Sequence, residues 1–164
     1  MKNAESGMRV RPIGIIHSPF REVAGMPIQS AFAGDAEGVV EVFPEYRDGL
    51  RDLDGFERVW LLYWFHKAVE ARLVVKPFRD DEERGLFATR APCRPNPIGL
   101  SAVRLLTVNV SEGKLRVAGI DVLDGSPLLD IKPYVPDWDA FPASRSGWLE
   151  RASGRTRSDS RFST

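Results

Sequence analysis

The run Val59–His66 (VWLLYWFH) constrains the fold most, because apolar side chains occupy both of its alternating faces. A strand with this pattern is expected to be covered on both sides. A buried helix is the alternative, but the short length and the aromatic residues favour a strand. The run is also far shorter than the roughly 20 residues of a membrane-spanning helix. We therefore expect a buried strand and no membrane span.

The other segments that predict strands are short and bounded by turn residues. Ser101–Val110 and Lys114–Val122 flank Ser111-Glu112-Gly113, a pattern typical of a hairpin with glycine at a positive φ. Glu45–Phe56 has the spacing of a helix of about two turns. Further strand candidates are Val10–His17, Val39–Phe43, Leu73–Val75 and Leu86–Ala88. Many short strands with few short helices predict a mostly β fold, a single closed or nearly closed β-barrel.

The length and the C-terminal composition suggest one domain followed by a tail. The chain has 164 residues, of which 43% are hydrophobic, enough for one real core. We expect the barrel domain to span residues 8–142. Residues 143–164 are rich in Arg, Ser and Gly, which predicts a basic, flexible tail with a frayed end from Ala152 to Thr164. Such a tail could contact nucleic-acid phosphates or could simply be solvated.

Charge and cysteine content exclude several classes of protein. The 23 basic residues balance the 23 acidic ones, so a uniformly basic nucleic-acid-binding surface is excluded, although a local basic patch is not. Cys93 is alone, with His17 and His66 as the chain's histidines, so neither an internal disulfide nor a metal site is expected. Residues Met1–Arg11 lack the apolar stretch of a signal peptide. We expect a cytoplasmic protein.

The segment Ala88–Ser101 (ATRAPCRPNPIGLS) is the first candidate for a functional site. Its three prolines fix φ and remove backbone donors, which makes a stiff, non-helical loop. Arg90, Arg94 and Asn96 lie in it and suit anionic or amide-bearing ligands. A loop ordered before binding loses less entropy when a ligand binds. A rigid turn with solvated arginines is the simpler alternative.

The segment Ile120–Tyr134 (IDVLDGSPLLDIKPY) is the second candidate. Asp121, Asp124 and Asp130 bring three carboxylates within ten residues, and Lys132 follows closely. The sequence leaves open which of them converge, and Asp124 could merely cap the Asp-Gly-Ser-Pro turn. No G-x-S-x-G, phosphate-binding loop or G-x-G-x-x-G motif is present, so hydrolase, nucleotide triphosphatase and Rossmann interpretations lose their usual support.

Taken together, these segments resemble the TsaA-like (TrmO-like) family of S-adenosylmethionine-dependent tRNA (adenine-N6)-methyltransferases. The double signature ATR-x-P-x-RPNPIG and DG-[ST]-P-x-x-DIKPY is specific, and the matching segments cover most of residues 10–142 in the family's order. The segments are Ile13–Phe20, Pro27-Ile28-Gln29, Leu62–His66, Leu86–Ser101 and Ile120–Pro136.

The resemblance implies a non-Rossmann β-barrel methyltransferase that works as a homodimer, with the cofactor near the subunit interface. Its substrate would be tRNA, methylated on N6 of a threonylcarbamoyladenosine next to the anticodon. It also implies residues that contact S-adenosylmethionine. They are Pro27, Ile28, Gln29, His66, Lys67, Arg90, Leu100, Asp121, Val122, Leu123 and Asp124.

The chemistry of the residues is consistent with this assignment. Arg90 can bind the cofactor's carboxylate, and Asp121 or Asp124 can accept from its ammonium or ribose diol. Methyl transfer needs mainly alignment and removal of one proton. We expect Asp124 or Asp130 as the base and Tyr134 as an orienting hydroxyl.

Substrate contacts and alternatives complete the interpretation. We expect Arg94, Asn96 and Lys132 to bind the substrate. Longer family members carry an additional C-terminal domain, so substrate reach could differ here. Two alternatives stay open: a barrel that binds S-adenosylmethionine or RNA without turnover, and a methyltransferase on another acceptor.

Overall fold

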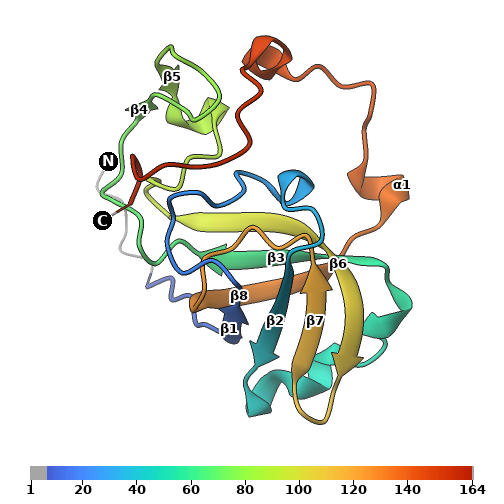
Figure 1. The fold of residues 1–164 in the computed structure, drawn as a ribbon. Coiled ribbons are helices and arrows are strands. Elements are labelled where there is room, and N and C mark those ends of the chain that lie inside the picture. The colour runs from blue at the N-terminus through green and yellow to red at the C-terminus, as the bar shows by residue number, and fades with distance from the viewer. Residues whose placement is uncertain (1–6, 164) are drawn as a thin grey trace.

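Six strands close into an antiparallel barrel in the computed structural model, which describes residues 7–163 (Figure 1). Around the barrel the order is β1-β2-β7-β6-β3-β8. The strands are β1 (Gly14–His17), β2 (Glu37–Val42), β3 (Arg58–Trp64), β6 (Ile98–Asn109), β7 (Lys114–Ala118) and β8 (Ser126–Pro133). The predicted mostly β barrel is therefore confirmed. Residues 1–6 and Thr164 lie outside the described residues. The structure therefore does not cover the first part of Met1–Arg11, the segment in which no signal peptide is expected.

Alternation along β3 separates the barrel interior from its outer face. Val59, Leu61 and Tyr63 point into the core and are at most 4% exposed. Trp60 and its alternate neighbours on the other face are half-buried, so the strand is confirmed but its outer side is only partly covered. Inward-facing aliphatic residues from all six strands meet those of β3, as expected when a sheet closes on itself. One core therefore fixes the positions of all the loops that leave the barrel.

The hairpin between β6 and β7 forms where the sequence predicts it. Gly113 has a φ of +69°, and a Cβ there would lie 2.5 Å from the carbonyl oxygen of Val42. Glycine is therefore needed at this turn both for its backbone conformation and for the close approach of β2.

Several short segments differ from the prediction. The expected two-turn helix Glu45–Phe56 is instead two 3-10 helices, Pro44–Leu50 and Leu53–Gly55. Asp52 lies between them with a φ of +64°, which interrupts any continuous α-helix. Leu86–Ala88 is also a 3-10 helix rather than a strand.

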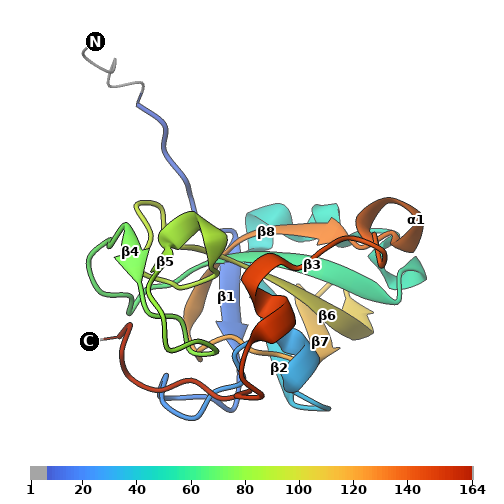
Figure 2. The same ribbon diagram turned by 90° about the horizontal axis from the view of Figure 1, so that it is seen from above.

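A small two-stranded hairpin lies beside the barrel. It consists of β4 (Val74–Val75) and β5 (Arg84–Gly85), on the side away from α1 (Pro136–Asp139) when seen from above (Figure 2). Further 3-10 helices span Ser30–Phe32 and Gly147–Arg151. No helix within residues 7–163 is both long and apolar enough to cross a membrane.

The C-terminal segment returns to the barrel instead of extending from it. After α1 it passes over the β4–β5 side of the molecule, as Figure 1 shows. Phe162 is 3% exposed and packs in a second apolar cluster with Val75, Leu86, Ala91 and Cys93. The frayed end expected from Ala152 onward is therefore wrong for this part of the chain, because a buried aromatic side chain anchors it. The division at residue 142 stays a prediction.

Backbone hydrogen bonds tie the same segment to the loop before the first 3-10 helix. Ile28 N–H donates to Thr156 O at 2.9 Å, and Ser158 N–H donates to Met26 O at 2.8 Å. These bonds satisfy backbone N–H and C=O groups of two loops that belong to no strand of the barrel.

Replacing Phe162 by alanine should release this segment. Removing a buried phenylalanine typically costs about 3–5 kcal/mol. Here we expect that loss to lower the free energy needed to open the second cluster locally. Hydrogen exchange at the Ile28 and Ser158 amides should accelerate strongly. The matched control is Phe141→Ala, since Phe141 is 72% exposed and should leave both amides unchanged. Equal exchange in the two variants would contradict the anchoring role.

Candidate functional site

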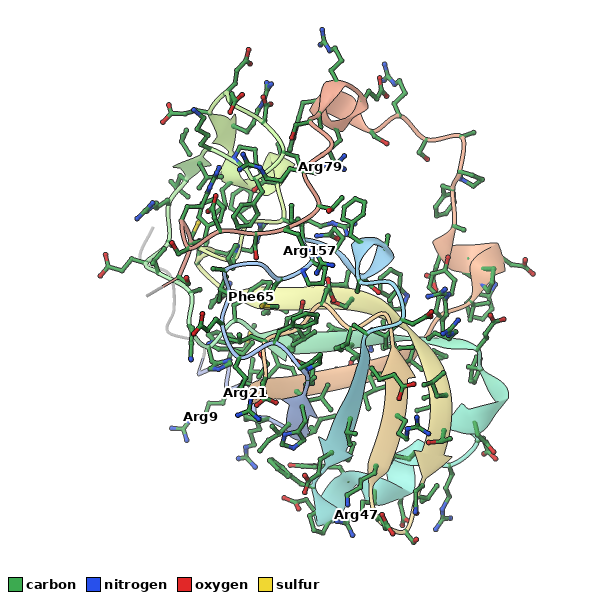
Figure 3. All side chains as sticks on the ribbon, viewed as in Figure 1. Arg9, Arg21, Arg47, Phe65, Arg79 and Arg157 are labelled. Atoms are coloured by element: carbon green, nitrogen blue, oxygen red, sulfur yellow. The ribbon has the colours of Figure 1, made fainter. Side chains whose placement is uncertain are left out.

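A cavity of about 800 Å³ lies where the C-terminal end of β3 meets the loops beside the barrel. Its walls come from segments far apart in the sequence: residues 23–32, 63–68, 77–79, 87–94, 98–100, 121–126 and 148–162. The lining is rich in aromatic and aliphatic side chains, and its size is typical of a small-molecule site. Figure 3 shows Phe65 and Arg79 in this region, with Arg157 between them.

Most of the predicted cofactor contacts line this cavity. They are Pro27, Ile28, Gln29, His66, Lys67, Arg90, Leu100, Asp121 and Leu123. Val122 is instead 1% exposed and belongs to the barrel core. Asp124 accepts a hydrogen bond from the Ser18 backbone N–H at 3.0 Å, so its carboxylate holds the turn after β1. The structure thus brings the Pro27 loop and both motif segments together.

Asp121 is the carboxylate among the residues that line the cavity. Its Oδ1 accepts a hydrogen bond from Ser101 Oγ at 2.5 Å, and Tyr63 Oη lies 3.1 Å from the same Ser101 oxygen. Burial raises the pKa of Asp121 to about 6, against the opposing effects of the Ser101 hydrogen bond and of Arg90. The carboxylate is therefore mostly ionised at pH 7 and becomes protonated as the pH falls through about 6.

His66 follows β3 and lies in the same cavity. Burial, assisted by the charge of Lys67, lowers its pKa below 6.5, so its ring is neutral at pH 7. Its Nδ1 lies 3.3 Å from Ser126 Oγ, and that hydroxyl donates its proton to Leu123 O at 2.7 Å. Since the hydroxyl has one proton, a hydrogen bond between this pair takes its hydrogen from Nδ1, and in that tautomer Nε2 is an acceptor.

Positive charge dominates the rest of the cavity. Lys67, Arg79, Arg90 and Arg94 line it, and Arg90 lies close enough to Asp121 to favour its ionised form. Arg90 is exposed and donates to Gln29 Oε1 at 2.5 Å, which connects the proline-rich loop to the Pro27 loop. A cavity with this balance suits a ligand that carries both a carboxylate and an ammonium group.

The side chain of Arg94 supports the proline-rich loop from within. Its Nη1 donates to Thr89 O at 2.9 Å and to Ala91 O at 3.3 Å. Its guanidinium also lies 5.7 Å from the ring centroid of Phe87. Arg94 lines the cavity, and one of its guanidinium nitrogens, Nη1, holds carbonyls of the proline-rich loop.

Four other predicted site residues lie outside the cavity. Asp130 and Lys132 form an ion pair of 2.9 Å on β8, and Asn96 is exposed on the proline-rich loop. Tyr134 packs against Trp60 in a smaller groove, of about 440 Å³, which shares Arg90 and Leu100 with the cavity. Asp124 and Asp130 are close to Asp121 along the chain, but they do not line the cavity. Asp124 binds the turn after β1, and Asp130 lies on β8 in its ion pair with Lys132.

Sequence reasoning missed the aromatic walls and the two hydroxyls behind Asp121. Tyr63 and Phe65 read as ordinary members of an apolar run, and Ser101 as the first residue of a hairpin strand. Trp148 was assigned to the tail, yet its Nε1 donates to Ala88 O at 2.8 Å and it lines the cavity. A glycine two residues before Ser101 was the available signal, since it marks a place where a large side chain crosses the strand.

No group of three or more His, Cys, Asp or Glu side chains among residues 7–163 is arranged to hold a metal ion. The residues that line the cavity instead suit an organic zwitterion that also has an apolar part.

Comparison with known proteins places this chain in a family. The model for the tRNA-methyltransferase O N-terminal domain matches residues 15–140. A "Probable S-adenosyl-L-methionine-binding protein" of Pyrococcus abyssi is 52% identical over 155 residues, covering 93% of this chain and 83% of that protein.

Two relatives carry more specific descriptions. The tRNA (adenine(37)-N6)-methyltransferase of Escherichia coli is 34% identical over 155 residues, covering 90% of this chain and 66% of the enzyme. The crystal structure of TrmO from Pseudomonas aeruginosa is 42% identical with a TM-score of 0.71, covering 85% of this chain and 62% of that one. This chain thus spans about two thirds of both enzymes, and it belongs to the tRNA-methyltransferase O family.

Proposed function

We propose that this protein is an S-adenosylmethionine-dependent methyltransferase that acts on N6 of threonylcarbamoyladenosine next to the tRNA anticodon. One observation carries the proposal: Arg90 and Asp121, one from each motif segment, line the same cavity together with the Pro27–Gln29 loop. The family membership of residues 15–140 gives that cavity its chemical interpretation. A tRNA substrate also implies a cytoplasmic protein.

The residues of the cavity fit S-adenosylmethionine. Arg90 can donate to the carboxylate of its amino-acid end, and Asp121 can accept from its ammonium or ribose hydroxyls. Backbone groups of Pro27–Gln29 and the rings of Tyr63 and Phe65 offer polar and apolar surface for the adenosine. When bound, the cofactor supplies a methyl group on an excellent leaving group.

The residues then have to align the acceptor nitrogen and receive one proton. Alignment alone can contribute about 7–11 kcal/mol, so a weak base is sufficient. Neutral His66 lies in the cavity and presents an acceptor nitrogen, whereas the carboxylates of Asp124 and Asp130 are held elsewhere. We therefore assign proton acceptance to His66.

The positive mouth of the cavity supports an RNA substrate. Arg79 and Lys67 line it, and the backbone of Arg157 in the C-terminal segment forms a β-bridge with Pro27, which lines it too. Figure 3 shows the Arg157 and Arg79 side chains in this part of the molecule. Such groups can neutralise phosphates without a uniformly basic surface. The threonyl carboxylate of the modified nucleoside adds a further anion for them, and its ureido linkage makes the N6 proton more acidic.

The acceptor can be tested with two tRNA preparations. Purified protein and S-adenosylmethionine should methylate tRNA from cells that make threonylcarbamoyladenosine and leave tRNA from cells that cannot make it unmodified. Mass spectrometry of the digested nucleosides reads out the product. Equal methylation of both preparations would contradict the substrate, and cofactor binding without any product would favour a binding protein that does not turn over.

A matched pair of arginine variants locates the reaction in the cavity. Arg90→Ala should weaken cofactor binding roughly 10- to 100-fold, because a charge-assisted hydrogen bond contributes about 1.5–3 kcal/mol. The control is Arg116→Ala, whose side chain forms an exposed ion pair with Glu37 on the far strands. Equal affinities for the two variants would place the cofactor outside this cavity.

We further propose that the protein is a homodimer whose interface is the outer face of β3 and β6. Trp64, Leu62 and Trp60 pair across the ladder with Ile98, Leu100 and Ala102. These outward residues form a continuous apolar patch, and Ile98 and Leu100 are 40% and 47% exposed. A second copy would cover such a patch, and Leu100 would bring the interface to the edge of the cavity.

Placing a charge in this patch should separate the subunits. Light scattering should return a dimer mass for the parent and for Thr107→Glu, an exposed residue farther along β6, and a monomer mass for Leu62→Glu. A monomer mass for the parent across the micromolar range would contradict the interface.

A further inference from the structure

The pairing of β3 with β6 builds a hydrogen-bonded chain behind the cavity. In the register, Tyr63 is opposite Gly99, and Leu61 is opposite Ser101. Tyr63 and Ser101 are therefore diagonal neighbours on the inner face of the sheet, a separation that an aromatic side chain can span. A Cβ on Gly99 would lie 2.3 Å from the Tyr63 ring. Glycine at this position lets the ring cross β6 so that its hydroxyl meets Ser101.

The number of available protons decides which group donates in each of these hydrogen bonds. The Ser101 hydroxyl has a single proton, and the 2.5 Å contact to a carboxylate oxygen of Asp121 uses it. The Ser101 oxygen must then accept from the Tyr63 hydroxyl at 3.1 Å. Burial raises the pKa of Tyr63 above its usual value, so the phenol stays a donor at any working pH. Tyr63 thus donates to Ser101, and Ser101 donates to a negatively charged Asp121.

We propose that Ser101 and Tyr63 are positioning residues that hold Asp121 as an oriented carboxylate for the cationic or hydroxyl groups of the cofactor. This inference rests on the proposed function of the cavity and gives the Ser101 and Tyr63 hydroxyls a part in it, separate from the surface that the Tyr63 ring offers to the cofactor. Ser101 is 2% and Tyr63 4% exposed, and each hydroxyl finds its partner within the chain. Apart from Ser126, the other buried side chains of the six barrel strands are apolar, so two buried hydroxyls linked to one carboxylate are unusual there and point to a function beyond packing.

Several groups around Asp121 favour or oppose its ionisation. Tyr63 reaches it through Ser101 from the barrel, and Arg90 approaches from the proline-rich loop. The backbone N–H of Ser30 contributes from the first 3-10 helix, and His66 and Lys67 line the same cavity. Burial opposes ionisation of this carboxyl, whereas the Ser101 hydrogen bond and Arg90 favour it. Without the hydroxyl, a larger fraction of Asp121 would be protonated near neutral pH.

The test is a pH titration of Asp121 and of cofactor binding in the same variants. In Ser101→Ala the pKa of Asp121, read from its carboxyl carbon by NMR without cofactor, should rise by about one unit. The signal is assigned by its loss in Asp121→Asn. The pH at which the affinity for S-adenosylhomocysteine falls to half should rise equally. Tyr63→Phe should give a smaller shift in the same direction, and Ser101→Thr should restore the parent values.

Controls separate positioning from folding and from the proposed function. Ser111→Ala, in the exposed β6–β7 turn, should match the parent throughout. An unmoved pKa in Ser101→Ala would overturn the inference, as would an affinity that falls by the same factor at every pH. A parent protein that binds no S-adenosylhomocysteine would contradict the proposed function instead, and the NMR titration would still decide whether the hydroxyl chain sets the ionisation of Asp121.

Discussion

The antiparallel pairing of β3 with β6 is the constraint on which the site depends. It fixes which residues of the two strands share the inner face, and a shift by one residue would turn every one of them outward. The same register leaves an apolar stripe on the outer face, at the edge of the cavity. The interior polar chain and the exterior patch are thus two consequences of one pairing.

The loops around the barrel end are stiffened by different means that act together. Three prolines fix φ in one loop, and the Arg94 guanidinium binds the Thr89 and Ala91 carbonyls beside them. The C-terminal segment closes the other side through Phe162 and through hydrogen bonds to the Pro27 loop. A site assembled from such ordered loops loses little entropy when a ligand binds. This explains how a protein with few helices presents a well-formed cavity.

The fold and much of the cavity could be predicted from sequence, because they depend on local patterns and a specific double motif. Alternation in Val59–His66 and the glycine turn after Val110 predicted strands that the structure has. Arg90 and Asp121 lie in the two motifs that stand out along the chain, and the family resemblance assigned both of them to the cofactor. The wider outline of the barrel followed from the same short strands.

What sequence could not give is the direction of each side chain after a turn. Asp124 and Asp121 are three residues apart, yet one accepts a backbone N–H of the Ser18 turn and the other lines the cavity. The composition of the tail likewise concealed Phe162, whose burial depends on a cluster formed by distant segments. Long-range packing decides both outcomes, and no local pattern reports it.

The central claim is that Arg90 binds the carboxylate, and Asp121 the ammonium or the ribose hydroxyls, of one cofactor molecule in this cavity. A crystal structure of the protein with S-adenosylhomocysteine tests it most directly. The account predicts the amino-acid carboxylate within hydrogen-bond distance of the Arg90 guanidinium, and the ammonium or ribose hydroxyls at the Asp121 carboxylate. Density for the ligand elsewhere on the barrel, with neither side chain in contact, would contradict it.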